Sequence, residues 1–260
     1  MIDIHCHILP GLDDGAAELD DSIAIAAAAV ADGTRTVVAT PHGAKWAYNG
    51  SLAETQRKVS ELQAEISSRG VDLEVLTGLE AHITPDLAEL HDRGGVFTLN
   101  GSRYLLVEFP LQILPVYTDQ ALFDLQVRQL IPVIAHPERN LAIAAKPEIL
   151  WRMVSHGMLA QVTAGSLVGL FGPKTREVAE LLVTHRLVHV IASDAHSVTG
   201  RGPVLSAAVK RAGELIGQDA AGAMVTVTPW TILRNESVQV PEPEPLEQPR
   251  SWFHFGHKKF

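Results

Sequence analysis

Two closely spaced pairs of potential metal ligands stand far apart in the chain. His5 and His7 are two residues apart near the start, and Asp194 and His196 repeat that spacing. In a β-strand, side chains two residues apart face the same way and lie about 6.6 Å apart along the chain, so both can reach one ion. A lone buried histidine is usually structural, but two at this spacing at a strand end favour metal ligation.

Five more candidate ligands lie between the two pairs: Asp14, His42, Glu80, Glu108 and His136. The last four follow apolar, strand-like runs, where a carboxylate is costly unless it is paired or bound to metal, and Glu80 could bridge two ions. Asp14 lies in a turn, and capping of the next helix is its alternative role. Imidazoles and carboxylates at several strand ends predict a multinuclear metal site in a barrel mouth, and with it metal-assisted hydrolysis.

Apolar, β-branched runs alternate with helical stretches along the chain. The seven candidate strands are Ile2–His7, Thr36–Thr40, Leu73–Gly78, Tyr104–Glu108, Pro132–Ala135, Leu159–Val162 and Val188–Ala192. A capping box of Ser51 and Glu54 predicts a helix before the third strand. Strands that alternate with helices pair in parallel, which predicts an α/β fold. In α/β barrels the active site lies at the carboxyl ends of the strands, where these polar residues stand.

The composition changes after residue 236. Residues 1–236 are predicted to form one catalytic domain, and residues 237–260 a linker and a tail. Four prolines between Val240 and Pro249 remove backbone donors and fix φ, which predicts an extended linker. The aromatic and basic tail, Trp252–Phe260, is either flexible or a docking segment for a partner.

Charge and cysteine content exclude several classes of protein. The formal net charge of -9 and the lack of a basic stripe argue against a nucleic-acid partner. No apolar run reaches about 18 residues and no signal-peptide pattern opens the chain, so an integral membrane protein is not expected. One cysteine permits no internal disulfide, which suits the cytoplasm. Leu12, not arginine, stands six residues after Cys6, which excludes the phosphate loop of cysteine phosphatases.

Five further histidines are expected in surface or structural roles: His82, His91, His156, His185 and His189.

Five motifs together resemble a known family. They are Asp3–Gly15, Ala39–His42, Val107–Pro110, Ala135–Arg139 and Ser193–His196. Over about residues 1–235 the chain resembles the polymerase-and-histidinol-phosphatase (PHP) superfamily, and within it the metal-dependent tyrosine-protein phosphatases of the CpsB/CapC type. The resemblance implies a distorted seven-stranded (β/α)7 TIM-like barrel. It also implies a three-metal centre, commonly of Mn2+, with iron, zinc, cobalt and magnesium as the other candidates.

The resemblance implies a role for each candidate residue. One metal is assigned to His5, His7, Glu80 and Asp194. The second is assigned to Glu80, Glu108 and His136, and the third to Asp14, His42 and His196. Arg139 and Arg201 are expected to grip the substrate phosphate, and His42 is also counted among the catalytic residues. Gly43 departs from the family, whose members usually carry a second histidine there.

Metal ions can activate attack on a phosphate monoester, because they neutralise the anionic phosphoryl group and lower the pKa of a bound water. A metal-bridging hydroxide is therefore the expected nucleophile. The resemblance implies a phosphotyrosine substrate, the C-terminal tail of a bacterial tyrosine kinase that regulates capsule or exopolysaccharide synthesis. The alternative is a small-molecule phosphomonoesterase such as histidinol-phosphate phosphatase, although the Leu9–Gly15 motif favours the first. A nuclease is disfavoured by the acidic balance, and a silent metal-binding scaffold by the intact ligand positions.

Overall fold

Parallel β-strands in two sheets form the centre of the protein, described here by a computed structural model that covers residues 1–43, 51–239 and 241–246. The first sheet has the order β1 (Ile2–Cys6), β2 (Thr36–Ala39), β3 (Glu74–Thr77). The second has the order β4 (Glu80–His82), β5 (Tyr104–Glu108), β6 (Ile131–Ala135), β7 (Leu159–Thr163), β8 (Val190–Ala192). Every pairing between neighbouring strands is parallel, which confirms the predicted α/β class.

The described residues form eight strands where seven were expected: the third expected strand, Leu73–Gly78, is observed as β3, and β4 follows it as a short strand that was not predicted. β3 ends at Thr77 and pairs with β2, whereas β4 begins at Glu80 and pairs with β5. Between them, a Cβ added at Gly78 would lie 2.6 Å from Cγ1 of Val38, so this close passage requires glycine. The break lets one stretch of chain serve both sheets and places Glu80 at their junction.

Two isolated bridges bring the edges of the sheets together. Cys6, at the end of β1, pairs with Ala195, just beyond β8. His42, just beyond β2, pairs with Glu80 at the start of β4. The carboxyl ends of strands from both sheets therefore meet around one mouth, as in an α/β barrel.

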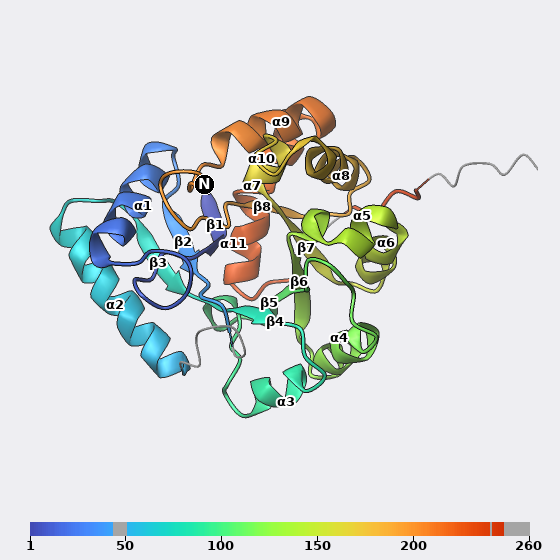
Figure 1. The fold of residues 1–260 in the computed structure, drawn as a ribbon, viewed down its shortest axis with the longest axis horizontal. Helices are drawn as coiled ribbons and strands as arrows, with labels where there is room; N and C mark the ends of the chain where they lie inside the picture. Colours follow the sequence, from blue (N-terminus) through green and yellow to red (C-terminus); the bar gives the residue numbers. More distant parts are fainter. Residues whose placement is uncertain (44–50, 240, 247–260) are drawn as a thin grey trace, which may run out of the picture.

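Helices cover the outside of both sheets (Figure 1). α1 (Leu19–Ala31) and α2 (Leu52–Ser68) pack on the first sheet, and Ser51 caps α2 as predicted, because its side chain accepts a hydrogen bond from the Glu54 N–H at 3.2 Å. The other α-helices are α3 (Leu87–Asp92), α4 (Thr118–Val127), α5 (Leu141–Ala145), α6 (Glu148–Ser155), α7 (Ala164–Leu167), α8 (Pro173–Thr184), α9 (Ser206–Ile216), α10 (Gln218–Ala223) and α11 (Val227–Leu233). Two 3-10 turns, η1 (Leu99–Gly101) and η2 (Pro137–Arg139), complete the described elements. None of the described helices has the length and apolar character to cross a membrane.

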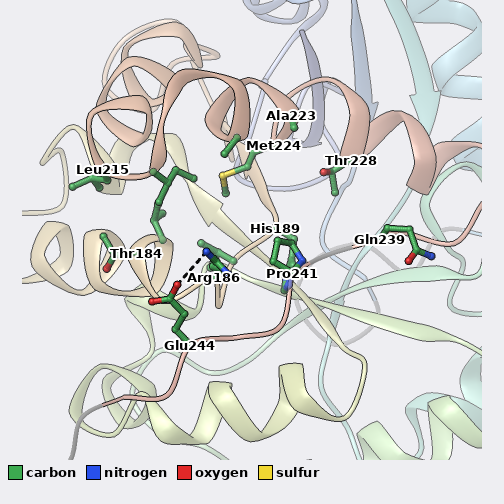
Figure 2. A pocket seen from close by; sticks show the side chains of 14 residues that line it. Thr184, Arg186, His189, Leu215, Ala223, Met224, Thr228, Gln239, Pro241 and Glu244 are labelled. Carbon is green, nitrogen blue, oxygen red and sulfur yellow. Dashed lines mark ion pairs between the residues drawn. The ribbon is translucent and has the colours of Figure 1, made fainter.

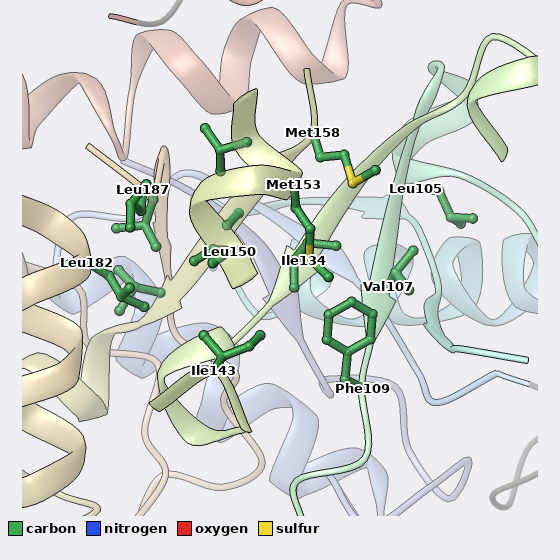
Figure 3. Packing of buried hydrophobic residues seen from close by; sticks show 14 of the residues in the cluster. Leu105, Val107, Phe109, Ile134, Ile143, Leu150, Met153, Met158, Leu182 and Leu187 are labelled. Carbon is green, nitrogen blue, oxygen red and sulfur yellow. The ribbon is translucent and has the colours of Figure 1, made fainter. Parts of the chain in front are cut away.

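Side chains alternate between the barrel interior and its outer layer. The interior cluster contains Leu106 of β5 and Val190 of β8, and α11 contributes Ile232 to it. The intervening residues face outward, where Val107 and Ile134 pack beneath the helices (Figure 3). Because the strand period is two residues, the inward row of β5 continues from Leu106 to Glu108, and that of β8 continues from Ala192 to Asp194 in the mouth.

The linker residues that the structure describes contact the domain. The hydroxyl of Tyr104 accepts a hydrogen bond from the Val238 N–H at 3.2 Å, and the carbonyl of His185 accepts one from the Glu244 N–H at 2.9 Å. Glu244 also pairs with Arg186 at 3.2 Å. The division after residue 236 stays a prediction, and the tail Trp252–Phe260 lies outside the described residues.

A cavity of about 530 Å³ lies between the described linker and helices α8 to α11 (Figure 2). His189, just before β8, lines this cavity and is buried. Its Nδ1 accepts a hydrogen bond from the Ala160 N–H at 3.0 Å, so the proton of the neutral ring is on Nε2. Burial lowers the pKa of His189 to about 4. Its burial and its hydrogen bond to the backbone support the structural role that was expected for His189.

We predict that His189 makes the fold sensitive to acid. In the unfolded chain its pKa returns to about 6.5, so between pH 6.5 and 4 the unfolded state binds more protons and stability falls as the pH is lowered. Between pH 7 and 5, wild-type protein should lose about 2 kcal/mol more than the His189→Asn variant, which keeps an acceptor for the Ala160 N–H. Urea unfolding at both pH values measures this. His156→Asn, at an exposed position, is the control and should behave like wild type.

Candidate metal centre

The Glu80 carboxylate is the centre of the site, where four imidazoles surround it. Its Oε1 lies 3.3 Å from His5 Nε2 and 3.0 Å from His136 Nε2. Its Oε2 lies 3.3 Å from His7 Nε2 and 2.9 Å from His42 Nδ1. The side chain is fully buried, so these imidazoles replace water as its partners.

The ring nitrogens of His5 and His7 test whether the site suits a cation. His5 Nδ1 donates to Gln161 Oε1 at 3.0 Å, and His7 Nδ1 donates to Asp13 Oδ2 at 2.8 Å, since those oxygens can only accept. In the neutral rings, both Nε2 atoms therefore carry lone pairs, and they face each other at 3.2 Å. Asp194 Oδ1 lies 3.4 Å from each Nε2. Facing lone pairs beside carboxylates require a positive charge between them, and the donor set fits a divalent metal.

A second cluster lies on the other side of His7. Asp14 Oδ1 is 3.3 Å from His42 Nε2 and 3.2 Å from His196 Nε2. His196 Nδ1 donates to the Asp194 carbonyl at 3.0 Å, which leaves Nε2 free of the proton and available as a ligand atom. Asp14 is exposed, and its contacts place it at the edge of this cluster; the sequence alone had also allowed it a role as a helix cap.

Glu108 completes the arrangement. Its Oε1 lies 3.7 Å from His136 Nε2, and its Oε2 lies 3.9 Å from His42 Nδ1. The structure thus brings all nine predicted ligands into one network. Within the described residues, the sets whose ligand atoms lie within 4.8 Å of one another are His7–Asp14–His42–His196, His5–His7–Glu80 and His42–Glu80–Glu108. These sets overlap with the three expected groups, but each pair of sets has one residue in common, which is His7, His42 or Glu80. The assignment of residues to individual ions stays a prediction.

The charges of the network support one another. Burial alone would raise the pKa values of Glu80 and Asp194, but the charge of His5 and bonds to neighbouring imidazoles hold both well below the usual range. Burial likewise opposes the rise in the pKa values of His5 and His7, which their carboxylate partners produce. Burial and the nearby positive groups His7 and Arg201 lower the pKa of His196 to about 4. A metal cation would replace protons that the imidazoles share with these carboxylates.

Two of the candidate ligands occupy a left-handed backbone conformation. His136, directly after β6, has φ 31°, and Asp194, two residues after β8, has φ 52°. Such values are uncommon outside glycine and raise the energy of the backbone unless the surroundings impose them. At both positions the strand ends and the chain turns over the mouth, which directs the side chain toward the centre.

The two predicted phosphate-binding arginines meet at one atom. Arg139 Nη1 and Arg201 Nη2 donate to Asp194 Oδ2 at 2.7 Å and 2.6 Å. Asp194 therefore offers one oxygen to His5 and His7 and the other to the guanidinium groups. The Arg139 guanidinium also lies over the Phe171 ring, 4.6 Å from its centroid. The arginines border the candidate metal centre and provide charged forks beside it.

Three further residues contact the candidate ligands and were not predicted to belong to the site. Asp13 orients His7 and also accepts from the His42 N–H at 3.0 Å; although burial opposes it, the bond to His7 lowers the pKa of Asp13 to about 2. Gln161 orients His5. His82, predicted as structural or on the surface, has Nδ1 3.5 Å from Glu108 Oε2. Its position two residues after Glu80 on a strand was the signal that could have found it.

Gly43 has a steric explanation in this chain. A Cβ added there would lie 2.9 Å from Cδ2 of Leu79 and 3.3 Å from the Glu80 carbonyl. The Leu79 side chain is buried and fills the space beside residue 43. A histidine at position 43 would therefore require Leu79 to move.

Comparison with known proteins identifies the family to which the sequence is similar. The sequence pattern of the family described as "Capsular polysaccharide synthesis, CpsB/CapC" matches residues 1–234. The tyrosine-protein phosphatase YwqE of Bacillus subtilis (strain 168) is 38% identical over 248 residues, which are 95% of this chain and 97% of that protein. The tyrosine-protein phosphatase CpsB of Streptococcus pneumoniae is 29% identical over 246 residues, 92% of this chain and 100% of that protein.

A solved structure agrees with the sequence comparison. It comes from crystal structures of YwqE from Bacillus subtilis and CpsB from Streptococcus pneumoniae, which are described as unique metal-dependent tyrosine phosphatases. It matches with a TM-score of 0.91 and 38% identity, over 95% of this chain and 100% of that one. The match of residues 1–234 and the identity to YwqE show that the chain belongs to the CpsB/CapC family of capsular polysaccharide synthesis.

Proposed function

We propose that this chain is a metal-dependent protein-tyrosine phosphatase, which hydrolyses the phosphoric monoester of phosphotyrosine. The observation that carries the proposal is the junction at Asp194. One of its oxygens lies 3.4 Å from His5 Nε2 and His7 Nε2, and the other accepts from Arg139 and Arg201. Metal-binding and phosphate-binding side chains therefore share one carboxylate. Relatives of similar length are named for the same activity.

The nine candidate ligands would hold the metals, and the donor geometry around Glu80 supports that role. When bound, the metals neutralise phosphate charge and lower the pKa of water, which supplies the nucleophile. Manganese is proposed first, because it is the metal that the resemblance to the family implies. Iron, zinc, cobalt and magnesium are the alternatives, because imidazole and carboxylate donors suit several of these ions. A three-metal centre is supported by the three overlapping sets of ligand atoms.

The two arginines would bind the phosphate oxygens. Their guanidinium groups are planar donors that match two oxygens at once, and Asp194 holds them at the edge of the centre. The leaving tyrosinate has a pKa of about 10, so it needs less proton donation than an alkyl alcohol. His42 belongs to the ligand network and lies at the mouth, where its side chain is partly exposed.

A cysteine mechanism does not fit this site. Cys6 is fully buried and belongs to the apolar cluster between the first sheet and α1 and α2. Burial and then the nearby carboxylates Asp3 and Asp194 raise the pKa of its thiol well above the usual range. A thiol nucleophile must be exposed and readily ionised, and Cys6 is neither.

The proposed physiological substrate is the phosphotyrosine tail of a bacterial tyrosine kinase that regulates capsule or exopolysaccharide synthesis. The family description and the acidic balance, which disfavours nucleic acid, support this choice. A cytoplasmic location would follow from such a partner. We also propose that β3 and β4 together occupy the place of one bent strand, so that the eight strands correspond to the seven of the PHP barrel.

One side-by-side assay tests the function. The purified protein with Mn2+ is given a phosphotyrosine peptide, a phosphoserine peptide and histidinol phosphate. Preferential turnover of the phosphotyrosine peptide is expected. Faster hydrolysis of histidinol phosphate would establish the small-molecule phosphatase instead.

We predict that activity depends on Glu80 and not on Cys6. Glu80→Gln keeps the shape of the side chain but removes its charge, so it should lower bound metal and reduce kcat by about 100-fold or more. Chelation should abolish wild-type activity, and Mn2+ should restore it. Metal analysis and phosphotyrosine-peptide kinetics measure both effects. Cys6→Ala is the control, and loss of its turnover with metal still bound would refute the metal mechanism.

We predict that Arg139 and Arg201 act on the substrate rather than on the metals. Replacement of either by alanine should leave metal content unchanged and lower kcat/KM by about 10- to 100-fold, since a charge-assisted bond contributes about 1.5–3 kcal/mol. Lysine should rescue only in part, because an ammonium cannot reproduce the planar fork. The four variants are compared by metal analysis and peptide kinetics. Wild-type kcat/KM in both alanine variants would remove these residues from the site.

A further inference from the structure

We infer that an apolar groove beside the two arginines holds the aromatic ring of the phosphotyrosine, and this inference rests on the proposed function. The groove has a volume of about 210 Å³. Its walls come from the segment after β7, with Leu170 and Phe171, and from the loop after β8, with Val198, Arg201 and Val204. It therefore opens at the same end of the barrel as the candidate metal centre.

Several apolar side chains that line the groove are exposed to water. Val168 and Leu170 on one wall, and Val198 on the other, are each 48% exposed, and Val204 is 46% exposed. Single exposed apolar residues need no explanation, but four around one hollow form a patch suited to an apolar ligand. Gly165 lets this wall pack closely, because a Cβ there would lie 3.0 Å from Cδ2 of Leu170 and 3.1 Å from Cε2 of Phe171.

Both proposed phosphate-binding arginines lie next to the groove. Arg201 lines it and also donates through Nη2 to Asp194. Arg139 reaches the same carboxylate and lies over the ring of Phe171, which is part of the groove wall. A phosphate held by these guanidinium groups therefore has the apolar groove as its immediate neighbour.

The size and chemistry of the groove match a phenyl ring. A cavity of about 150 Å³ lined by apolar side chains accommodates benzene, so 210 Å³ is sufficient for the ring of a phosphotyrosine. The phosphate oxygen is bonded directly to this ring, so charge and apolar surface are adjacent in the ligand as they are in the site. Histidinol phosphate carries an ammonium group that is charged at neutral pH, so it would gain less from such walls.

The groove can be tested with substrates that differ only in what surrounds the phosphate. Wild-type protein loaded with Mn2+ is compared with Leu170→Asn and Val198→Asn. Three ligands are used: a phosphotyrosine peptide, phenyl phosphate, and inorganic phosphate as a competitive inhibitor. Leu170→Met keeps an apolar side chain, and Val127→Asn, at a 63% exposed position at the end of α4, is the matched control.

Both asparagine variants should raise KM about tenfold for the peptide and for phenyl phosphate alike, because each loses an apolar contact with the ring. The inhibition constant of inorganic phosphate, which has no ring, should change less than about twofold, and Leu170→Met and Val127→Asn should match wild type.

Three results would overturn the inference. Unchanged KM values for both aryl substrates would show that the ring lies elsewhere. A rise for the peptide alone would assign the groove to a neighbouring residue of the peptide. An equal loss of phosphate inhibition would show damage to the arginines or metals. If wild-type protein itself does not hydrolyse phosphotyrosine, the proposed function fails, independently of the groove.

Discussion

The fold is organised around one buried carboxylate that four imidazoles must satisfy. Glu80 has no access to water, and each of its oxygens faces two histidines. An isolated carboxylate in such a place would be costly, so the elements that carry its partners cannot shift independently. His5 lies on β1 and His7 directly after it, whereas His42 lies in the segment after β2 and His136 directly after β6. The contacts around Glu80 therefore link both sheets and support the closure of the barrel.

The break between β3 and β4 allows Glu80 to connect the two sheets. Gly78 allows the chain to pass against Val38, and two residues later Glu80 begins the strand that pairs with β5. The same residue forms a bridge with His42 beyond β2. One carboxylate therefore stands where the two sheets meet. Asp194 has the complementary position after β8, with one oxygen toward the histidines and one toward the arginines.

Sequence reasoning identified the candidate ligands, which the structure brings together, because their types and positions are unusual. Charged side chains at the ends of apolar strands have few explanations other than pairing or metal, and the two-residue spacing of His5 and His7 follows directly from strand geometry. The α/β class followed from the alternation of strands and helices. These inferences depend on local pattern, which a single sequence contains.

The features that sequence reasoning missed depend on contacts between distant residues. The additional strand β4 was missed because it depends on its pairing with β5 and on the break at Gly78, which packs closely against Val38. Asp13 and Gln161 acquire their roles only when the turn and β7 meet the histidines. The steric reason for Gly43 depends in the same way on where Leu79 lies.

The left-handed backbone at His136 and Asp194 limits how this centre can change during evolution. Outside glycine, that conformation is tolerated best by asparagine, aspartate and histidine. Histidine and aspartate are also good metal donors, so residue types that suit this backbone would also suit an ion. Glutamate offers the same carboxylate but lacks that tolerance. At these two positions the backbone therefore favours histidine, aspartate and asparagine as donors, whereas Glu80 and Glu108 lie on regular strands, where the backbone adds no such preference.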